Sequence, residues 1–552
     1  MFDLVIANAV IVSAANRYVP FIGSIAIEQG RLVYVGEKNF LPSEAYTYED
    51  VEGDIVMPGL FNNHCHAEMS IMRGIGDGMT LLEQKQVFSD IDWFRNYCTD
   101  DERFAARQLT YCEALRFGTT FLNDVMYWSL GERAVDAMVS TGIRGALSED
   151  VRPNFTNPDI QISPQKLKSF FHCCKTEGLV PVVAGIAEED YSHERLKKIC
   201  ELRNVIGNSF YTCHLEETDW RMKHVQKKFN CTPIEVLNSY GMVNDNLIAS
   251  HVVYASPRDI HILRDARAAV VNTPICEMKI ADGVAPIYEM IRQGICVSLG
   301  TDGAIWNNSN DIFREMKAML LLQTVKNGIR SINERDVLDM ATINGAKTFH
   351  VEDRLGTLEQ GKDADFIRIS TKGFSMCPLR LGKYENVVSL IVNNATGGDV
   401  RDVYIHGKCI VKEPDQHQPG HRGKGVICEL LSFKVDFLFC VHNSLLLYIH
   451  GCGHGDPFPL FVPFQLGVHG RSDKYGFIAE APVQIIYRPF QGLNPLKPLI
   501  FPEEIELVWK LLTDQVDGPD TDCPDGLIPG VPGSKQFHGP VHHLFPALGG
   551  IG

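Results

Sequence analysis

The sequence predicts an α/β protein built around an eight-stranded (β/α)8 TIM-type barrel. Helical patterns alternate with apolar strand patterns, as they do in parallel βα units. The alternation runs from about Met57 to Val351, close to the roughly 250 residues that such a barrel takes. Short strand patterns recur on both sides of it, so we expect both ends to share a small β-sandwich domain. The expected parts are residues 1–56 (sandwich, first part), 57–351 (barrel), 352–411 (sandwich, second part) and 412–552 (irregular or poorly ordered extension).

The segment that follows Thr99 predicts a helix. Thr99 and Glu102 form a capping-box pattern, in which each side chain accepts a hydrogen bond from the other residue's backbone N–H. Gly118 ends the pattern, as glycine commonly does at helix C-termini. The residues expected on the core face of this helix are Ala105, Leu109 and Cys112.

A second helix is predicted from Ser163, with Pro164 at its first position, to Gly178. The stretch LVPVVAGIA, residues 179–187, follows it as a nearly continuous apolar run, which is typical of a strand buried on both faces. One such helix and one such strand make one unit of the barrel.

Strand patterns lie at both ends of the barrel region. β-branched and alternating residues favour strands, and glycine-containing turns at Gln29-Gly30 and His406-Gly407-Lys408 connect neighbouring ones. The expected strands lie within residues 3–13, 24–30, 31–37, 363–370, 386–393 and 400–411.

The composition changes after Val411. More than half of the 28 prolines lie from Lys412 onward, together with dense glycine and histidine. Such a segment lacks the periodicity that builds a core, and its cysteines and histidines do not have zinc-finger spacings. We therefore expect an irregular extension there.

Composition and charge exclude several classes of partner. With 45% hydrophobic and 22% charged residues, the chain has a globular composition. The net charge of −16 disfavours nucleic acid, since phosphate binding draws on Lys and Arg. It is compatible with a neutral or cationic small molecule. The apolar segment at 430–450 contains Lys434 and Asp436 within one membrane thickness, so we expect no membrane partner.

The cysteine pattern indicates the compartment. The 16 cysteines are scattered without a CxxC pair, which favours free thiols over a disulfide framework. Asp3 and Asn8 interrupt the N-terminal apolar run where a secretory signal would be continuous. We therefore expect a cytoplasmic protein.

The stretch FNNHCHAEMS places His64 and His66 one residue apart after an apolar run. On a strand, residues i and i+2 project from the same face, and barrel enzymes keep their sites at the C-terminal strand ends. Two neutral imidazoles at one point suit a divalent metal such as zinc. Alone, the pair is more often explained by local hydrogen bonds, so a metal site needs further ligands.

Three more polar residues end apolar runs. They are His214 in FYTCHLEET, His251 in LIASHVVYAS and Asp302 in CVSLGTDGA. With the first pair, four strand ends then present possible ligands. Asp302 is also explained as a turn residue, and Glu217, three residues after His214, as a solvated loop acid.

Five motifs in a fixed order resemble the metal-dependent amidohydrolase superfamily, in its branch of adenosine-type and S-adenosylhomocysteine deaminases, guanine deaminases and triazine hydrolases. The motifs are MPGLFNNHCHAEMSIMRG, CHLEET, ASHVVYAS, KIADGVAPI and SLGTDGAIWNNSNDIFREMKAMLLLQ. The resemblance covers about residues 1–411. It implies a hydrolase that acts on carbon–nitrogen bonds other than peptide bonds in a small molecule, and it implies a homo-oligomer.

The resemblance implies a role for each matched residue. One divalent metal ion, zinc or as the alternative iron, would activate a water molecule. Asp302 would take the proton of that water, and His251 would orient it. Glu217 would protonate the ring nitrogen and then the departing amine. The implied metal ligands are His64, His66, His214 and Asp302.

Two segments near the implied site depart from the family. Glu188 stands in AGIAEEDYS where a His-containing turn is usual, and Glu277 stands in VVNTPICEMKIADG where His-Asn-Pro is commonly followed by Ser-Asn. These acids would line an acidic mouth, although solvated charges explain them equally well. Trp93 in LLEQKQVFSDIDWF corresponds to a segment from which relatives contact substrate, and a lid helix with a buried tryptophan also explains it. The expected substrate-binding residues are Glu188, Trp93 and Glu277.

The favoured function is a hydrolytic deaminase that releases ammonia from an amino-substituted nitrogen heterocycle, such as a purine nucleoside derivative, a pterin or a related base. The first alternative is a triazine-type hydrolase that removes chloride or an amine. Glu217 favours deamination, because ammonia needs a proton to leave and chloride does not. The second alternative is a non-catalytic barrel that acts as a binding subunit. A missing metal ligand would indicate it, and none of the implied ligands is missing.

Overall fold

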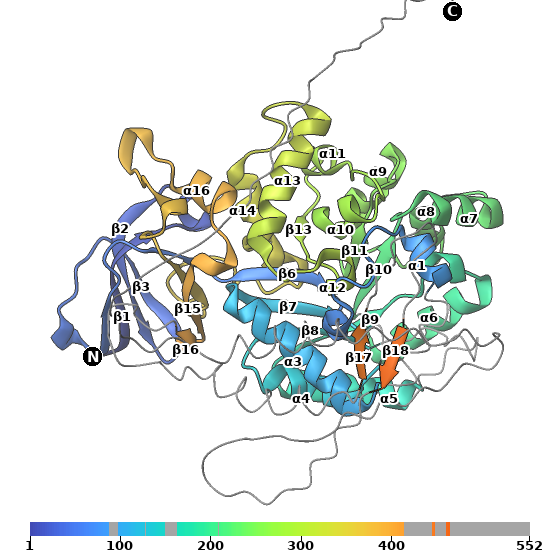
Figure 1. Cartoon of the computed structure of the whole chain (residues 1–552), viewed down its shortest axis with the longest axis horizontal. Coiled ribbons are helices and arrows are strands. Elements are labelled where there is room, and N and C mark those ends of the chain that lie inside the picture. Colours follow the sequence, from blue (N-terminus) through green and yellow to red (C-terminus); the bar gives the residue numbers. More distant parts are fainter. Residues whose placement is uncertain are drawn as a thin grey trace, which may run out of the picture. The chain divides into compact units, whose positions relative to one another are not determined.

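The computed structural model divides into two compact units, Met1–His442 and Asn443–Gly552. The first contains a parallel barrel and a separate mixed sheet (Figure 1). In the second, β17 (Ser444–Leu447) pairs antiparallel with β18 (Leu460–Pro463). The structure describes residues 1–87, 98–126, 129–149, 163–207, 209–412, 444–447 and 460–463.

Eight parallel strands form the barrel, and each pairs with its neighbours in chain order. Just beyond the last strand, the backbone N–H groups of Thr301 and Asp302 donate to the carbonyl of His64 at 3.0 and 2.9 Å. These bonds nearly close the barrel, and the predicted (β/α)8 fold is confirmed. The strands are β6 (Leu60–Cys65), β7 (Thr119–Val125), β8 (Arg144–Glu149), β9 (Val180–Ala184), β10 (Phe210–Leu215), β11 (Leu247–His251), β12 (Ala269–Asn272) and β13 (Val297–Leu299).

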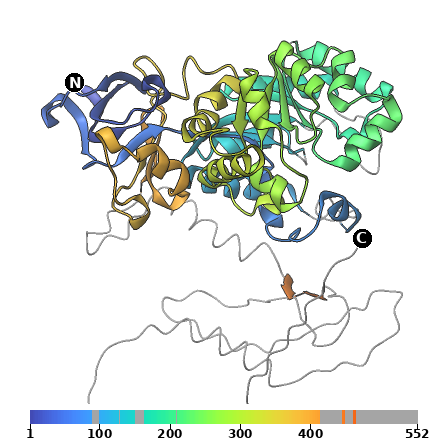
Figure 2. The same ribbon diagram turned by 90° about the horizontal axis from the view of Figure 1, so that it is seen from above.

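Helices follow the strands and surround them (Figure 2). As predicted, α3 (Asp100–Arg116) begins behind a capping box of Thr99 and Glu102. The side chain of Ser163 caps α5 (Pro164–Thr176). The other helices of the barrel region are α1 (Leu81–Val87), α4 (Glu132–Val139), α6 (His193–Ile206), α7 (Asp219–Phe229), α8 (Pro233–Ser239), α9 (Pro257–Ala266), α10 (Pro274–Lys279), α11 (Ile287–Arg292), α12 (Ala304–Asn307), α13 (Ile312–Asn327), α14 (Glu334–Ala341) and α15 (Ile343–Thr348).

The predicted core face of α3 is wrong in part. Leu109 is 39% exposed, whereas Arg107 is completely buried. The guanidinium of Arg107 lies 3.4 Å from a carboxylate oxygen of Glu68 and 3.3 Å from one of Asp124. Paired buried charges thus turn the helix away from the orientation that its apolar residues predicted. The helix ends at Arg116, and Gly118 follows the C-cap residue with φ +90°, as expected of a glycine that stops a helix.

Apolar side chains fill the barrel near the start of its strands. Phe61 and Phe121 stack with ring centroids 5.0 Å apart, and Phe349 lies 5.1 Å from Phe121. The polar site described below lies at the opposite, C-terminal end. Further members of this apolar cluster are Ala146, Val182, Ile248 and Val271.

The mixed sheet contains strands from both sides of the barrel region, as predicted. Its order is β16-β15-β14-β5-β1-β2-β3, and β4 also pairs with β1. Left-handed turns at Gln29-Gly30 and at His406-Gly407 connect antiparallel neighbours. The division of the chain at residues 56, 351 and 411 stays a prediction. The strands are β1 (Phe2–Ile11), β2 (Phe21–Glu28), β3 (Arg31–Gly36), β4 (Ala45–Asp50), β5 (Ile55–Pro58), β14 (Phe366–Ile369), β15 (Val400–Ile405) and β16 (Lys408–Lys412).

The strand predicted within residues 386–393 is wrong, because this segment is helical. It forms α16 (Val387–Asn393), which packs against α13 and α14. β-branched residues favour strands by a small margin only. Burial of five of its seven side chains against other helices outweighs that preference.

An ion-pair cluster joins β8 to the segment before β14. Arg144 donates from Nε to Asp365 at 2.7 Å and from Nη2 to Asp363 at 3.1 Å. Arg354 also donates to Asp363, at 2.6 Å. The Asp363 side chain is completely buried, and the hydrogen bonds from these arginines offset the cost of its burial.

We expect Arg144→Met to lower the free energy of unfolding by about 3 kcal/mol, because it removes the main partner of two buried carboxylates. Arg354→Met is the control. Its side chain is 50% exposed, and the expected loss is below about 1 kcal/mol. Urea unfolding followed by circular dichroism measures both midpoints. Equal shifts in the two variants would contradict this account.

Two findings concern membranes and disulfides. Within the described ranges, no helix is both long and apolar enough to cross a membrane. Of the apolar segment at 430–450, only β17 lies within the described residues. Every cysteine in the part of the chain that the structure describes is a free thiol.

Candidate metal centre and active site

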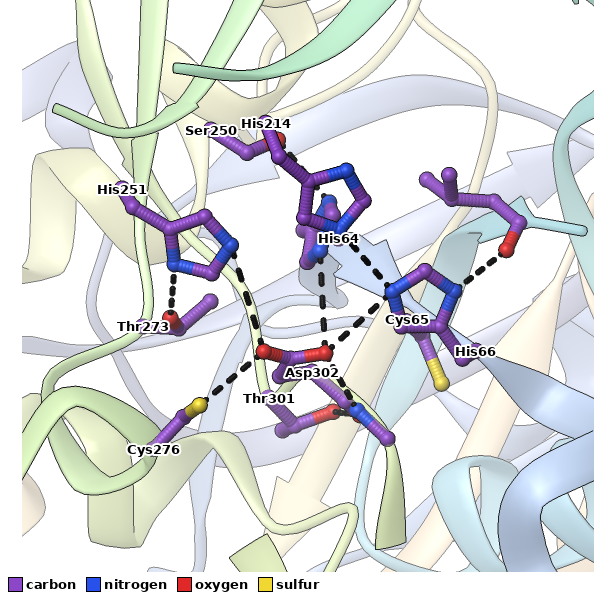
Figure 3. A network of polar contacts seen from close by, with 12 residues as sticks. His64, Cys65, His66, His214, Ser250, His251, Thr273, Cys276, Thr301 and Asp302 are labelled. Atoms are coloured by element: carbon purple, nitrogen blue, oxygen red, sulfur yellow. Dashed lines mark hydrogen bonds and ion pairs between the residues drawn. The ribbon is translucent and has the colours of Figure 1, made fainter. Parts of the chain in front are cut away.

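Five of the predicted site residues meet at the C-terminal end of the barrel strands (Figure 3). His64 lies in β6, His214 in β10, and His251 is the last residue of β11. His66 directly follows β6, and Asp302 follows β13 after two residues. His214 is half-buried and the other four are buried. The barrel thus brings together side chains that lie far apart in the sequence.

Nitrogen and oxygen atoms of these residues surround one small centre. Nε2 of His66 lies 3.1 Å from Nε2 of His214. Oδ1 of Asp302 lies 3.4 Å from Nε2 of His66 and 3.7 Å from Nε2 of His64. His251 approaches from the other side, with Nε2 4.0 Å from Oδ2 of Asp302. The spacing allows a single small ion to reach several donors.

The Nδ1 atoms of His64 and His66 contact neighbouring groups away from the centre, so the Nε2 atoms face it. Nδ1 of His66 lies 2.5 Å from the carbonyl oxygen of Val125. Because a carbonyl oxygen only accepts, Nδ1 donates the hydrogen, and Nε2 points to the centre. Nδ1 of His64 contacts the hydroxyl of Ser250 at 2.9 Å. Such partners fix the orientation of ligating imidazoles.

The centre fits a divalent metal ion. Burial lowers the pKa of His64 and of His214 well below the ordinary value, and the neighbouring histidines lower it further, so both rings are neutral donors. Nε2 of His64 is buried and has no hydrogen-bond partner among the described residues. Nε2 of His66 lies 3.1 Å from Nε2 of His214, an approach that a cation between them stabilises. Three imidazoles and one carboxylate suit zinc, and also iron.

Asp302 has a constrained backbone and a fixed carboxylate. Its φ of +62° lies in the left-handed region, which is uncommon for residues other than glycine. The backbone N–H of Gly303 donates to Oδ1 at 2.7 Å, and the thiol of Cys276 donates to Oδ2 at 3.0 Å. Burial raises the pKa of Asp302, but the surrounding histidines lower it below its ordinary value. The side chain is therefore a carboxylate at neutral pH.

The loop after β6 is anchored beneath the centre. Asp124 accepts a hydrogen bond from the backbone N–H of Ala67 at 3.1 Å and one from the hydroxyl of Tyr111 at 2.6 Å. The buried Arg107 lies against the same carboxylate. These contacts hold η3 (Ala67–Met72), the 3-10 helix that begins directly after His66.

His251 lies among three carboxylates. Oε1 of Glu217 is 3.9 Å from its Nε2, and Oε1 of Glu277 is 3.7 Å from its Nδ1. The hydroxyl of Thr273 lies 3.0 Å from Nδ1. Burial lowers the pKa of His251, but Glu217, Glu277 and Asp302 together raise it to about 10. The contacts of Nδ1 with Thr273 and Glu277 hold the ring with Nε2 toward the centre.

The three predicted substrate residues have different surroundings. Glu277 is buried next to His251, where it also accepts a hydrogen bond from Asn272 at 2.7 Å. Glu188 is buried and accepts a hydrogen bond from the backbone N–H of Glu216 at 2.6 Å, so its visible contact supports the loop after β10. Trp93 lies outside the described residues. Contact of all three with a substrate stays a prediction.

The sequence reasoning missed Arg221 and Trp306. Arg221 donates to Glu217, and their i,i+4 spacing is a signal that could have identified the pair. The ring of Trp306 lies 5.4 Å from that of His66, and its Nε1 donates to Gln84 at 2.8 Å. No sequence pattern predicts this tertiary contact.

Neutral imidazoles that face a carboxylate at the mouth of a parallel barrel are the hallmark of barrel hydrolases that use a bound metal. The sequence profile of the amidohydrolase family matches residues 55–410. The chain belongs to this metal-dependent family. The resemblance inferred from the five motifs is therefore confirmed.

Relatives with named activities cover most of the chain. The 5'-deoxyadenosine deaminase of Methanopyrus kandleri is 31% identical over 411 residues, which make up 72% of this chain and 91% of the relative. The 5-methylthioadenosine/S-adenosylhomocysteine deaminase of Desulforudis audaxviator is 30% identical over 421 residues, 74% of this chain and 93% of the relative.

A solved structure supports the fold. The crystal structure of an adenosine deaminase from Xanthomonas campestris with bound zinc has a TM-score of 0.69 with this chain. It is 21% identical, and the match covers 79% of this chain and 99% of the other. At this identity the likeness supports the barrel fold alone.

Proposed function

We propose that the chain is a hydrolytic deaminase that replaces the amino group of a 6-aminopurine nucleoside by a carbonyl oxygen and releases ammonia. The observation that carries the proposal is the convergence of one metal-type donor set with Glu217 and His251 at the same strand ends. Two relatives are named for activity on 5'-deoxyadenosine and on 5-methylthioadenosine or S-adenosylhomocysteine. They support a nucleoside without a free 5'-hydroxyl as the substrate.

The proposed cofactor is one divalent ion, with zinc preferred over iron. When bound, it supplies Lewis-acid activation of a water molecule near neutral pH. Three imidazoles and one carboxylate support this assignment, because zinc sites of hydrolases combine such nitrogen and oxygen donors. The proposed ligands are His64, His66 and His214, whose nitrogens lie together, and Asp302, whose Oδ1 faces His64 and His66.

Asp302 and His251 act on the attacking water in the proposed reaction. Oδ1 of Asp302 faces His64 and His66, and Oδ2 faces His251. As a carboxylate, Asp302 accepts the proton that the water gives up. Nε2 of His251 orients the water, because Thr273 and Glu277 hold the opposite edge of the ring.

Glu217 moves protons on the substrate side. It gives a proton to the ring nitrogen next to the attacked carbon while the new carbon–oxygen bond forms. The proton that Asp302 took from the water passes to Glu217, which gives it to the amino nitrogen. The carbon–nitrogen bond then breaks and ammonia leaves, while the proton of the new hydroxyl group returns to Glu217 as the carbonyl forms. One water is consumed and one carbonyl group is formed for each ammonia released.

A substrate panel tests this function. The full chain, loaded with zinc, is assayed for ammonia with 5'-deoxyadenosine, 5'-methylthioadenosine, S-adenosylhomocysteine, adenosine, guanine, a pterin and a chlorotriazine. We expect ammonia and the 6-oxo product from the 5'-modified nucleosides, with the highest kcat/KM among the panel. Chloride release without ammonia would support the triazine-type alternative. A metal-loaded protein that releases neither would support the binding subunit and contradict the proposal.

Thr273→Val is expected to lower kcat by about 10-fold and to leave KM nearly unchanged, because it removes the hydroxyl that holds Nδ1 of His251. Steady-state kinetics on the best panel substrate measure both constants. Thr324→Val is the matched control, since that hydroxyl donates to a carbonyl of its own helix α13. Equal kcat values in the two variants would exclude a role for Thr273 in orienting His251.

We also propose a cytoplasmic homo-oligomer. The free thiols of the described residues support a reducing compartment. Sedimentation velocity of the full chain measures the oligomeric state, and a monomer at micromolar concentration would contradict this part of the proposal.

A further inference from the structure

A chain of charged side chains leads from α1 to Glu217. Arg221 donates from Nε to Oε2 of Glu189 at 2.8 Å and from Nη2 to Oε1 at 3.3 Å. The same guanidinium donates from Nη1 to Oε2 of Glu217. Lys85, on α1, donates to Oε1 of Glu189. Four alternating charges therefore connect three separate segments of the chain.

Burial increases toward the active site along this chain. The side chain of Lys85 is 30% exposed, that of Glu189 14%, that of Arg221 9% and that of Glu217 4%. Charge pairs strengthen as water is excluded, so the contact between Arg221 and Glu217 is the least screened of the series. The guanidinium of Arg221 is held there by directional hydrogen bonds to both glutamates as well as by charge attraction.

Arg221 determines which oxygen of Glu217 faces the centre. Oε2 of Glu217 receives the hydrogen bond from Arg221, and Oε1 lies 3.9 Å from Nε2 of His251. A carboxylate fixed at one oxygen can rotate little, so the second oxygen keeps its direction toward His251. The oxygen that transfers a proton is then Oε1.

The guanidinium itself is fixed by its surroundings. The two bonds to Glu189 form a planar fork that a lysine cannot reproduce. The ring of Trp220 lies 5.3 Å from the guanidinium carbon and 5.4 Å from the ammonium nitrogen of Lys85. Burial raises the pKa of Glu189, but Arg221 and Lys85 lower it to about 2, so Glu189 remains a charged partner.

We propose that Arg221 is a positioning residue that holds Oε2 of Glu217 and thereby aims Oε1 at the reacting ring, with Glu189 fixing the guanidinium in turn. This inference rests on the proposed deaminase function. The Glu188–Asp190 turn then serves to align Glu217 through Arg221. Glu189 binds both Lys85 and Arg221, so its carboxylate is not available to bind the substrate.

Kinetics test the positioning role. Arg221→Gln is expected to lower kcat by about 10²-fold, the cost of a misplaced reacting group, with KM changed by no more than a few-fold. Arg221→Lys should retain more activity than Arg221→Gln, because it keeps a charge near Glu217 without the fork. Arg195→Gln is the matched control. Arg195 pairs with Asp190, the residue next to Glu189, and its expected kcat is that of the wild type.

A second readout separates positioning from a merely structural role. Free guanidinium added to Arg221→Ala is expected to restore part of kcat and to leave Arg195→Gln unaffected. An unchanged kcat in Arg221→Gln, a rise in KM that matches the fall in kcat, or the absence of guanidinium rescue would overturn the proposal.

The position of Glu217 can be measured without any turnover. Crystal structures of the wild type and of Arg221→Gln are expected to differ in the direction of the Glu217 carboxylate, and an identical carboxylate would overturn the inference. If the wild type released no ammonia from any panel compound, the proposed function would fail, while this comparison would still decide whether Arg221 holds Glu217.

Discussion

Glu217→Gln is expected to lower kcat by about 10²- to 10⁴-fold, the usual contribution of a general acid–base residue. The amide has the shape of the carboxylic acid but cannot take up and release a proton at neutral pH. Glu217 is buried, and its Oε1 faces Nε2 of His251 at 3.9 Å. Steady-state kinetics on the best panel substrate measure the loss.

The metal content of Glu217→Gln is expected to equal that of the wild type, because Glu217 is not among the proposed ligands. Glu289→Gln, an exposed acid on α11, is the control for the change of Glu to Gln and should retain full activity. A variant that keeps more than about a tenth of kcat would contradict general acid catalysis by Glu217.

His214→Ala is expected to lose both bound metal and turnover. The change removes one of the three proposed histidine ligands, whose Nε2 lies 3.1 Å from Nε2 of His66. Metal analysis of the purified variant and ammonia release from the best panel substrate measure the two effects. His261→Ala, an exposed histidine on α9, should change neither.

Thermal unfolding gives an independent measure of the same site. A ligand that binds only the folded state raises its stability in proportion to the logarithm of its concentration. Added zinc is therefore expected to raise the unfolding midpoint of the metal-free wild type and of His261→Ala, and not that of His214→Ala. A zinc-dependent rise of equal size in His214→Ala would contradict its assignment as a ligand.

Local chemistry explains which parts of the fold the sequence could predict. The capping box at Thr99 and Glu102 and the capping serine before Pro164 act within one turn, so each helix start follows from adjacent residues. The histidines and Asp302 could be placed together because parallel strands present their C-terminal ends on one side.

Tertiary contacts explain what the sequence could not predict. The helix at 387–393 and the buried Arg107 on α3 depend on distant partners that outweigh local preference. The bond from Cys276 to Asp302 also forms only when helix α10 packs against the end of β13. The contact of Arg221 with Glu189 joins helix α7 to the Glu188–Asp190 turn, and only the pairing of Arg221 with Glu217 has a local signal.

The substrate-side residues were the hardest to predict, for a related reason. Acidic residues in loops after strands look alike in sequence whether they face substrate, a cation or a backbone N–H. Glu188 contacts the backbone of Glu216, and Glu189 is engaged by Arg221 and Lys85. Of the two acids predicted to bind substrate, Glu188 and Glu277, only Glu277 lies against His251.

Zinc reconstitution of the metal-free full chain tests the central claim most directly. Ammonia release from 5'-deoxyadenosine is measured while zinc is added in known amounts. The account predicts that activity is absent without metal, rises in proportion to added zinc and reaches its maximum at about one ion per chain, the occupancy of a single four-ligand site. Full activity of the metal-free chain, or one firmly bound zinc per chain with no ammonia from any aminated heterocycle, would contradict it.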